Sequence, residues 1–462
     1  MSKRVSVRSR TYALSHHATE AKLDQVRDIL PLWKSCMASV QYIQVQKIRE
    51  GKPIGWLTAA DLAAFKLPLS ARMIKSVVNQ VNGSLRSWES KTKKLFRAEL
   101  KRSSFSGEDI EELHELNNTG KWFTDPRGVH IMEAVLKTNP FPVFRNARTM
   151  VFDSLVCESQ ESETNQFDRW LRVSTLTKGK PILIPITESD YYTSRSGEEA
   201  GVTQIRVGED NSVRFSRVKQ SPVAQVRSGG GNVVALDWGL VSLFTTNDGR
   251  RLGTQVYARL KKWDAQLEAL TKALQKNNIK PRDSKRYRKL NARIREYVRN
   301  EVNRILNKLA AEGVDELVVE SLDFRGGGLS RRLNRILSRA GRAAVRQKLA
   351  ALTEDYGVIV TEVNPAHTSR ECSGCGFADK LNRKTQKKFR CVFCGKTRNA
   401  DHNAANTLEV RRSRFADGLR YRDRNAVLSV IDSLFSQRWR IAAAEIRQRH
   451  QRGYSTASTA SL

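Results

Sequence analysis

The stretch CVFCGKTRNADHNAAN, residues 391–406, places two kinds of metal ligand close together. Cys391 and Cys394 have the spacing of a zinc knuckle, and Asp401 and His402 follow seven residues later. Soft thiolates suit zinc, whereas magnesium prefers hard oxygen ligands. Either the aspartate and the histidine complete the cysteine site, or this segment holds parts of two metal sites with different chemistry.

A second cysteine pair upstream decides between these interpretations. Cys372 and Cys375 are separated from the downstream pair by fifteen residues, and a glycine directly follows each pair. Two such turns supply four thiolates, which close a tetrahedral shell and leave the zinc no open position. We therefore predict one structural zinc, with Asp401 and His402 outside its shell; the alternative is four unrelated free cysteines. The predicted zinc ligands are Cys372, Cys375, Cys391 and Cys394.

Asp401 belongs with two other acidic residues, each at the end of a predicted regular element. Asp237 ends the apolar run VVALD, and Glu320 ends DELVVE. Taken singly, Asp237 could belong to a turn, Glu320 could be a charge at a strand edge, and Asp401 could cap the following helix. Together, three carboxylates in one predicted domain suit paired divalent cations that activate water for phosphodiester hydrolysis.

The charge balance points to a polyanionic partner. The 462 residues include 81 Lys and Arg against 48 Asp and Glu, a formal net charge of +33. Such an excess is self-repulsive unless an anion screens it, and nucleic acid is the expected polyanion. A ribosomal or chromatin-type basic protein is the alternative at this level. Two basic stretches are candidates for backbone contact, or else solvated helix faces, and their arginines are Arg286, Arg288, Arg293, Arg331, Arg332 and Arg335.

Several classes of protein are disfavoured by what the sequence lacks. It contains no GxxxxGK[ST] phosphate loop, no GxSxG elbow and no HExxH zinc site. It also has no apolar run of 18 residues and no signal-peptide pattern, so we expect a soluble, intracellular protein. Trp88 and Tyr192 could stack on bases, but we expect both to pack in the core.

The chain divides at SGGGN, residues 228–232, which is typical of a flexible linker. Before it, helical patterns at 18–51 and 70–102 and a hairpin at 203–218 predict a β module with inserted helices. After it, strands and helices alternate, which predicts an α/β or α+β sheet domain. The glycine-rich loop RGGG, residues 325–328, could be a lid over the acids or a plain connector.

The segments ALDWG, VVESL, NPAHTSRECSGCG, KFRCVFCG and NADHNAANTLE resemble the RuvC nuclease and zinc-ribbon blocks of the TnpB family. That family comprises transposon-encoded RNA-guided nucleases and their relatives, the compact type V CRISPR effectors. The resemblance covers roughly residues 230–410. It implies an RNase H-like (RuvC) α/β fold with an inserted zinc ribbon. It also implies that Asp237, Glu320 and Asp401 are the catalytic acids and bind two magnesium or manganese ions.

The N-terminal half resembles the family only in layout, as a β-barrel wedge split by a helical recognition lobe. The implied order is wedge, lobe, wedge, linker, nuclease, zinc ribbon, nuclease and a basic C-terminal tail of open role. The corresponding ranges are 1–17, 18–165, 166–227, 228–232, 233–368, 369–396, 397–412 and 413–462.

The resemblance implies an RNA-guided DNA endonuclease of the prokaryotic cytoplasm. Its partners would be a guide RNA and double-stranded target DNA beside a short flanking motif, with sequence read by base pairing. One alternative is an RNA-guided protein that binds DNA and represses without cleavage; such relatives usually lose one of the three acids, and all three are present here. A strand transferase on the same fold, which needs no RNA, is a second alternative.

Overall fold

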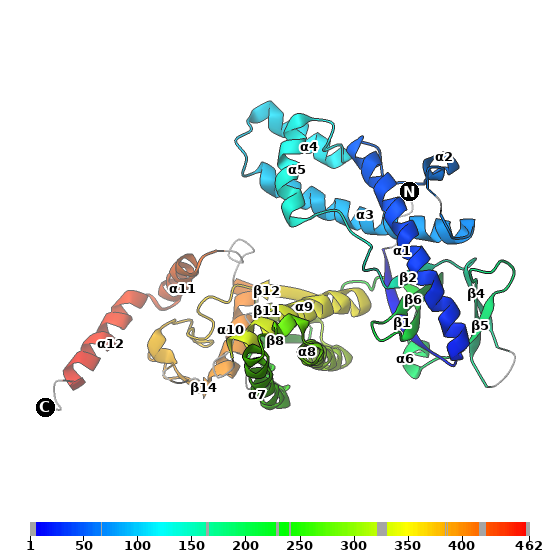
Figure 1. Cartoon of the computed structure of the whole chain (residues 1–462). Helices are drawn as coiled ribbons and strands as arrows, with labels where there is room; N and C mark the ends of the chain where they lie inside the picture. The colour runs from blue at the N-terminus through cyan, green and yellow to red at the C-terminus, as the bar shows by residue number, and fades with distance from the viewer. Residues whose placement is uncertain are drawn as a thin grey trace. The chain divides into compact units, whose positions relative to one another are not determined.

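A computed structural model describes residues 6–65, 67–162, 166–227, 231–239, 242–320, 330–383, 385, 387–414 and 422–458. The RGGG loop therefore lies outside the described residues, as does most of the predicted SGGGN linker. The chain folds into two compact units, Met1–Pro222 and Val223–Leu462 (Figure 1). The second unit begins before the predicted linker. The backbone N–H groups of Ala224 and Arg227 donate hydrogen bonds to the carbonyls of Glu354 and Gly357, which belong to this unit.

The first unit is built on a seven-stranded antiparallel sheet with the order β2-β6-β7-β1-β5-β4-β3. The strand β1 pairs with β7 along eight residues and with β5 only at its end, so it joins the two halves of the sheet. The predicted hairpin is present as β6 and β7, with Gly208 and Ser212 closing its turn. The strands are β1 Val7–His16, β2 Thr149–Phe152, β3 Cys157–Glu161, β4 Arg169–Val173, β5 Ile182–Thr187, β6 Glu198–Val207 and β7 Val213–Pro222.

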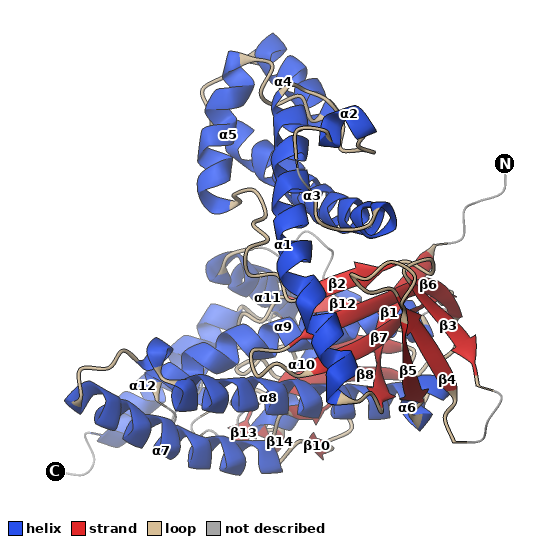
Figure 2. Cartoon of the chain, turned by 45° about the vertical axis from the view of Figure 1, so that its right-hand side comes forward, coloured by secondary structure: helices blue, strands red, loops and turns tan. Residues whose placement is uncertain are grey.

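Helices are inserted between β1 and β2, and the long helix α1 runs from the sheet to the other helices of this insertion (Figure 2). Ser70 begins α3 because its side chain accepts a hydrogen bond from the backbone of Met73, at 3.3 Å. The buried Trp33 packs edge-on against Phe152 of β2, so the insertion and the sheet share one core. The helices are α1 Glu20–Arg49, α2 Ala59–Leu62, α3 Ala71–Leu100, α4 Gly107–Thr119 and α5 Pro126–Thr138, and α6 Asp190–Thr193 follows β5.

The predicted bounds of the helical lobe, 18–165, extend too far toward the C-terminus. Both β2 and β3 fall within that range and belong to the sheet. The side chain of Gln80 on α3 donates to the carbonyl of Thr149 on β2 at 2.8 Å, which ties this strand to the helices. These strands are only four and five residues long, and such short runs carry little periodicity to separate them from loops.

The second unit contains a five-stranded mixed sheet with the order β10-β9-β8-β11-β12. The strands β8, β11 and β12 are parallel to one another, whereas β9 pairs antiparallel with β8, and the predicted Asn-Asp-Gly turn joins β9 to the antiparallel β10. The strands are β8 Val233–Trp238, β9 Phe244–Thr246, β10 Arg251–Leu252, β11 Glu316–Glu320 and β12 Ile359–Val363. Parallel strands with helices between them confirm the predicted α/β class of this region.

Helices cover both faces of this sheet. Leu236 and Val319 pack with apolar residues of three helices on one face. On the other face, Ala235 and Val318 pack with Leu408. The helices of the first face are α7 Gln255–Lys276, α8 Lys285–Ala311 and α9 Arg331–Tyr356, with the short η1 Pro281–Asp283 between α7 and α8, and α10 Ala400–Arg414 covers the second face.

A small cysteine-rich module lies between β12 and α10, as the sequence predicts for a ribbon inserted before the last acid. It contains η2 Lys380–Asn382 and the two-stranded sheet of β13 Lys388–Arg390 and β14 Thr397–Asn399. Two further helices follow α10, namely α11 Arg424–Trp439 and α12 Ala443–Ser458.

Candidate acidic site and metal centre

Asp237 and Glu320 lie side by side at the carboxyl ends of neighbouring parallel strands. The register of β8 and β11 pairs Leu236 with Val319, so these two acids are the next residue on each strand. Side chains alternate between the faces of a sheet. Both acids therefore share the face of Ala235 and Val318, which is the face that α10 covers.

Asp401 reaches the same place from the first turn of α10. The side chain of Asn399 accepts hydrogen bonds from the backbone of Asp401 at 3.0 Å and of His402 at 3.2 Å. Asn399 therefore caps the helix, and the alternative in which Asp401 is the cap is wrong. The carboxylate of Asp401 lies near the end of β8, because a Cβ on Gly239 would be 3.9 Å from its Oδ2.

The three carboxylates act on one another electrostatically. Burial raises the pKa of Asp237 well above its usual range, and the negative charges of Glu320 and Asp401 raise it further. The guanidinium of Arg383 acts in the opposite direction. Asp237 is only 8% exposed. A buried group of like charges favours a bound cation, because the cation relieves both the desolvation and the repulsion.

The acids are spread more widely than the cysteines. Among the residues that the structure describes, the four cysteines form the one group of three or more His, Cys, Asp or Glu whose ligand atoms all lie within 4.8 Å of one another. The carboxylates are thus not gathered around a single point. Together with the electrostatic influence of Glu320 and Asp401 on Asp237, this describes three carboxylates that face one another without closing on one point.

Two further residues contact the acids and were not predicted. Nη2 of Arg383, which follows η2, is 3.2 Å from Oδ1 of Asp401. The hydroxyl of Thr368 donates to Oε2 of Glu320 at 3.4 Å. The sequence holds no signal that separates Arg383 from the many other arginines. Thr368 belongs to the quoted NPAHTSRECSGCG block, so the block could have indicated it.

The residues after Asp401 fix α10 in place. The side chain of Asn403 accepts hydrogen bonds from the backbone and hydroxyl of Ser373, and donates to the carbonyl of Glu371 at 2.8 Å. His402 donates to the carbonyl of Asn247 at 3.0 Å, in the turn after β9. His402 is thus engaged with the backbone and lies outside the cysteine cluster, as predicted.

The four cysteines converge as predicted. Sγ of Cys372 is 3.7 Å from that of Cys394, and Sγ of Cys375 is 3.5 Å from that of Cys391. The backbone of the glycine after each pair donates to the carbonyl of the first cysteine, at 2.8 and 3.0 Å. Both glycines have positive φ angles, 84° and 75°, which explains why glycine follows each pair. This donor set fits one tetrahedral zinc.

The helices α11 and α12 complete the core of the cysteine module. The ring of Phe435 lies 5.2 Å from that of Phe377 and 4.9 Å from that of Phe393. The indole of Trp439 donates to the carbonyl of Cys375 at 2.9 Å. Arg447 of α12 donates to the carbonyl of Ala378 at 2.8 Å. Within the predicted basic tail, α11 and the first part of α12 are therefore packed on the module, which the sequence pattern of the tail did not reveal.

The six candidate nucleic-acid contacts do not share one environment. Arg332 bonds to the hydroxyl of Thr271 and lies over the ring of Tyr287, so it joins α9 to α7 and α8. Arg293 is exposed but lies 5.7 Å from the ring centre of Trp263. The other four are exposed and remain predicted contacts: Arg286, Arg288, Arg331 and Arg335.

The structure also bears on two other predictions. Trp88 and Tyr192 are both buried, and the indole of Trp88 donates to the carbonyl of Asn139 at 2.9 Å. Their expected place in the core is confirmed. None of the helices in the described part of the chain is both long and apolar enough to cross a membrane.

Two family models match separate parts of the chain. The Cas12f1-like, TNB domain model matches residues 343–408, which include the cysteine module and Asp401. The OrfB_IS605 model, described as a probable transposase, matches residues 213–324, which include Asp237 and Glu320. The resemblance to the TnpB family and the compact type V CRISPR effectors is therefore confirmed.

Similar proteins agree with these matches. The chain is 39% identical over 66 residues to the CRISPR-associated endodeoxyribonuclease Cas12f1 of Sulfoacidibacillus thermotolerans, covering 14% of this chain and 16% of that protein. It is 27% identical over 193 residues to the "Putative RNA-guided DNA endonuclease InsQ" of Escherichia coli (strain K12), covering 38% of this chain and 48% of that protein. Less than half of either relative is thus matched.

A solved complex of Cas12f1 with sgRNA and target DNA is a more distant likeness. Its TM-score is 0.43 at 11% sequence identity, covering 88% of this chain and 99% of that one. No residue role and no binding partner of this chain is inferred from so distant a likeness.

Proposed function

We propose that this chain is an RNA-guided DNA endonuclease that hydrolyses target DNA in a single RuvC-like, RNase H-like site. The observation that carries the proposal is the convergence of three acids from distant parts of the chain. Asp237 and Glu320 end neighbouring parallel strands, and Asp401 faces them from the covering helix. The relatives named as endonucleases match the same segments.

The donor set of this site fits two magnesium or manganese ions. All three side chains offer hard oxygen ligands, and burial together with the negative charges of Glu320 and Asp401 raises the pKa of Asp237, which a bound cation would offset. When bound, such ions activate a water molecule and stabilise the leaving oxygen of a phosphodiester. Asp237, Glu320 and Asp401 are the residues that would hold these ions.

The surrounding residues hold the carboxylates in position. Asn399 caps α10, which sets the direction of Asp401, and Thr368 orients Glu320 through its hydroxyl. The guanidinium of Arg383 forms an ion pair with Asp401 at 3.2 Å. Because a guanidinium also pairs with phosphate, Arg383 is placed to contact the DNA backbone at the site. The cysteine module, with zinc bound, would hold Arg383 against the acids.

The proposed partners are a guide RNA and double-stranded DNA with a short flanking motif. The net charge of +33 suits a polyanion, and the relatives' names refer to RNA guidance and to DNA cleavage. In this proposal the first unit contains a wedge domain and a helical recognition lobe. The protein would act in the prokaryotic cytoplasm.

The first test is to sequence the RNA that co-purifies with the protein expressed from its native locus. A defined RNA with a constant scaffold and a short variable segment is expected. The purified complex should then cut DNA matching that segment when magnesium is present. If no defined RNA is found, the guided function is wrong. If the complex binds matching DNA without cutting it, the chain is an RNA-guided DNA-binding protein instead.

A further inference from the structure

A groove with a volume of about 600 Å³ lies on the cysteine module, and it is called the ribbon groove below. Two segments that are far apart in sequence line it, one from η2 through β13 to the second cysteine turn and the other in α12. The volume is within the range of about 300–1,000 Å³ that is typical of small-molecule sites. Its lining includes Leu381, Val392, Phe393, Lys388, Arg390 and His450.

The lining of the ribbon groove is apolar, with cations and without acids. Lys388 and Arg390 are exposed and share one face of β13, because side chains alternate along a strand and Phe389 between them is buried. None of the described lining residues is acidic. No ion pair within the described part of the chain involves either cation. The charge of the groove is thus unbalanced and suits an anion from outside the module.

The wall that η2 forms is held in place by buried hydrogen bonds. The side chain of Asn382 is buried and donates to the carbonyls of Arg370 and Phe377 at 2.9 and 3.0 Å. It also accepts a hydrogen bond from the backbone of Val392 at 2.9 Å, which joins η2 to the second cysteine turn. The groove is therefore formed before a ligand arrives, so binding costs little in ordering the protein.

The wall that α12 forms is anchored as well. One turn before His450, the guanidinium of Arg447 donates to the carbonyl of Ala378 at 2.8 Å and pairs with Asp432 of α11 at 2.6 Å. His450 itself is partly buried. A molecule in the ribbon groove thus contacts the cysteine module and α12 at the same time.

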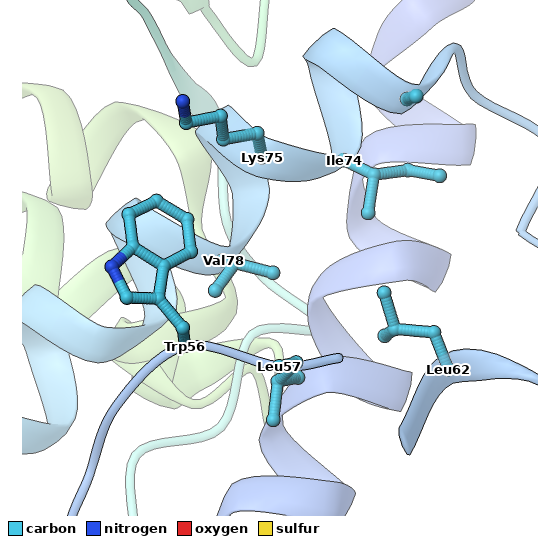
Figure 3. A pocket seen from close by; sticks show the side chains of 7 residues that line it. Trp56, Leu57, Leu62, Ile74, Lys75 and Val78 are labelled. Atoms are coloured by element: carbon cyan, nitrogen blue, oxygen red, sulfur yellow. The ribbon is translucent and has the colours of Figure 1, made fainter. Parts of the chain in front are cut away.

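Another groove shows how the charge of the ribbon groove differs. It has a volume of about 380 Å³ and lies between α3 and the loop before α2 (Figure 3). Among the described residues that line it, Lys75 is the one cation, and its Nζ lies 5.4 Å from the ring centre of Trp56. The two cations of the ribbon groove have no such partner within the described part of the chain, so both are available to a ligand.

We propose that the ribbon groove binds a small organic anion with an apolar body and a carboxylate or sulfonate group. The apolar body lies on Leu381, Val392 and Phe393, and the anionic group lies between Lys388 and Arg390. Charge complementarity selects an anion, and the apolar lining selects against sugar phosphates, which would lose hydration there without compensation. The inference goes beyond the proposed function, because it needs neither a guide RNA nor DNA.

Binding in the ribbon groove also affects the zinc site. Cys391 lines the groove, and η2 leads directly into Arg383, which pairs with Asp401. A molecule that bridges the cysteine module and α12 stabilises the closed module against the open state that releases zinc. At an anion concentration ten times its Kd, zinc release should therefore slow about tenfold.

The test uses the full, zinc-loaded chain after ribonuclease treatment, without DNA or magnesium. The probe is 8-anilino-1-naphthalenesulfonate, an aromatic anion whose fluorescence rises in an apolar site. Saturable binding is expected, and octanoate should displace the probe at a concentration about tenfold lower than 1-octanol, which has the same chain length without the charge. Trp56→Ala removes the indole of the other groove and should leave the octanoate-sensitive signal unchanged.

Matched charge variants test the two cations. Lys388→Gln with Arg390→Gln removes both charges from the groove, and Lys387→Gln removes a neighbouring exposed cation outside its lining. The double variant should bind octanoate about tenfold less tightly and 1-octanol equally well, whereas Lys387→Gln should match wild type. Leu381→Trp should fill the groove and abolish binding of both. Zinc content at the wild-type level shows that the module of each variant is folded.

Four results would overturn the proposal. One is a wild-type chain that shows no saturable binding of the probe. Another is equal affinity for octanoate in the wild type and the double charge variant. The third is equal displacement by octanoate and 1-octanol, which would make the groove a purely apolar site. The fourth is displacement by a short single-stranded DNA at a lower concentration than by octanoate. Unchanged zinc release at saturating octanoate would overturn the link to the zinc site.

Discussion

The cysteine module and the acidic site offer ligands that suit different metals, and they are built in different ways. The four cysteines lie within 23 consecutive residues, and two glycine turns bring their sulfur atoms together. The three acids span 165 residues and meet only because two parallel strands share a register and α10 covers one face. The first site depends on local spacing, whereas the second depends on the fold of the whole unit.

The two sites are nevertheless joined through α10. Arg411 on this helix is 1% exposed and pairs at 2.7 Å with Glu371, which directly precedes Cys372. Arg411 also donates to the carbonyls of Asn364 and Ala366. Arg411 thus fixes the helix that carries Asp401 to the residues that precede Cys372. A structural change in the cysteine module is therefore expected to alter the acidic site, and the reverse, through these contacts of Arg411.

Removing zinc should give the largest effect, because structural zinc supplies roughly 10 kcal/mol of folding free energy to such modules. The module should unfold, and Arg383 and Asp401 should lose their positions, so DNA cleavage should stop. Zinc content, thermal melting and cleavage are measured before and after chelation. Restoring zinc should restore all three. Unchanged melting and cleavage after verified zinc loss would show that the two sites are independent.

Asp237→Ala should reduce cleavage about a thousandfold or more, because it removes one of the three carboxylates proposed to hold the catalytic cations. This substitution should affect the acidic site and leave the cysteine module unchanged. Zinc content should not change, and melting should be unchanged or raised, because a buried carboxylate with a raised pKa is lost. Asp283→Ala, in the exposed turn between α7 and α8, is the matched control. Cleavage at the wild-type rate by Asp237→Ala would remove this residue from the site.

Arg411→Met should cost about 3–5 kcal/mol of stability, since it removes the buried guanidinium that pairs with the carboxylate of Glu371. The double variant Arg411→Met with Glu371→Gln should recover part of that loss. If the contacts of Arg411 couple the cysteine module to the acidic site, both variants should release zinc faster and cleave DNA more slowly than wild type. Chemical denaturation and a zinc-release assay measure the two effects. A loss of stability with unchanged zinc release and unchanged DNA cleavage would show that Arg411 does not couple the two sites.

Trp439→Phe should have the smallest effect, about 1 kcal/mol, because it removes one hydrogen bond to Cys375 and keeps an aromatic ring. Zinc release should be modestly faster. The exposed Gln437 on the same helix gives a control, Gln437→Ala, which should match wild type. Equal zinc release from both variants would mean that α11 does not support the module through this bond.

The same contrast explains what could be predicted from the sequence. The zinc ligands follow from spacing alone, and the strands that end at Asp237 and Glu320 follow from apolar runs. The cap at Asn399 was missed because Asp401 is an equally good capping residue. Arg383 and the packing of α11 and α12 could not be predicted, because both depend on contacts between segments far apart in sequence.

The position of Asp401 after Asp237 and Glu320 in the sequence has a consequence for synthesis on the ribosome. Glu320 is made 81 residues before Asp401, which corresponds to about 4–16 seconds at ordinary translation rates. During that interval the growing chain carries two of the three acids. A nascent or prematurely terminated chain that ends before Asp401 therefore lacks a complete carboxylate set, and α11 and α12, which pack on the cysteine module, are made later still.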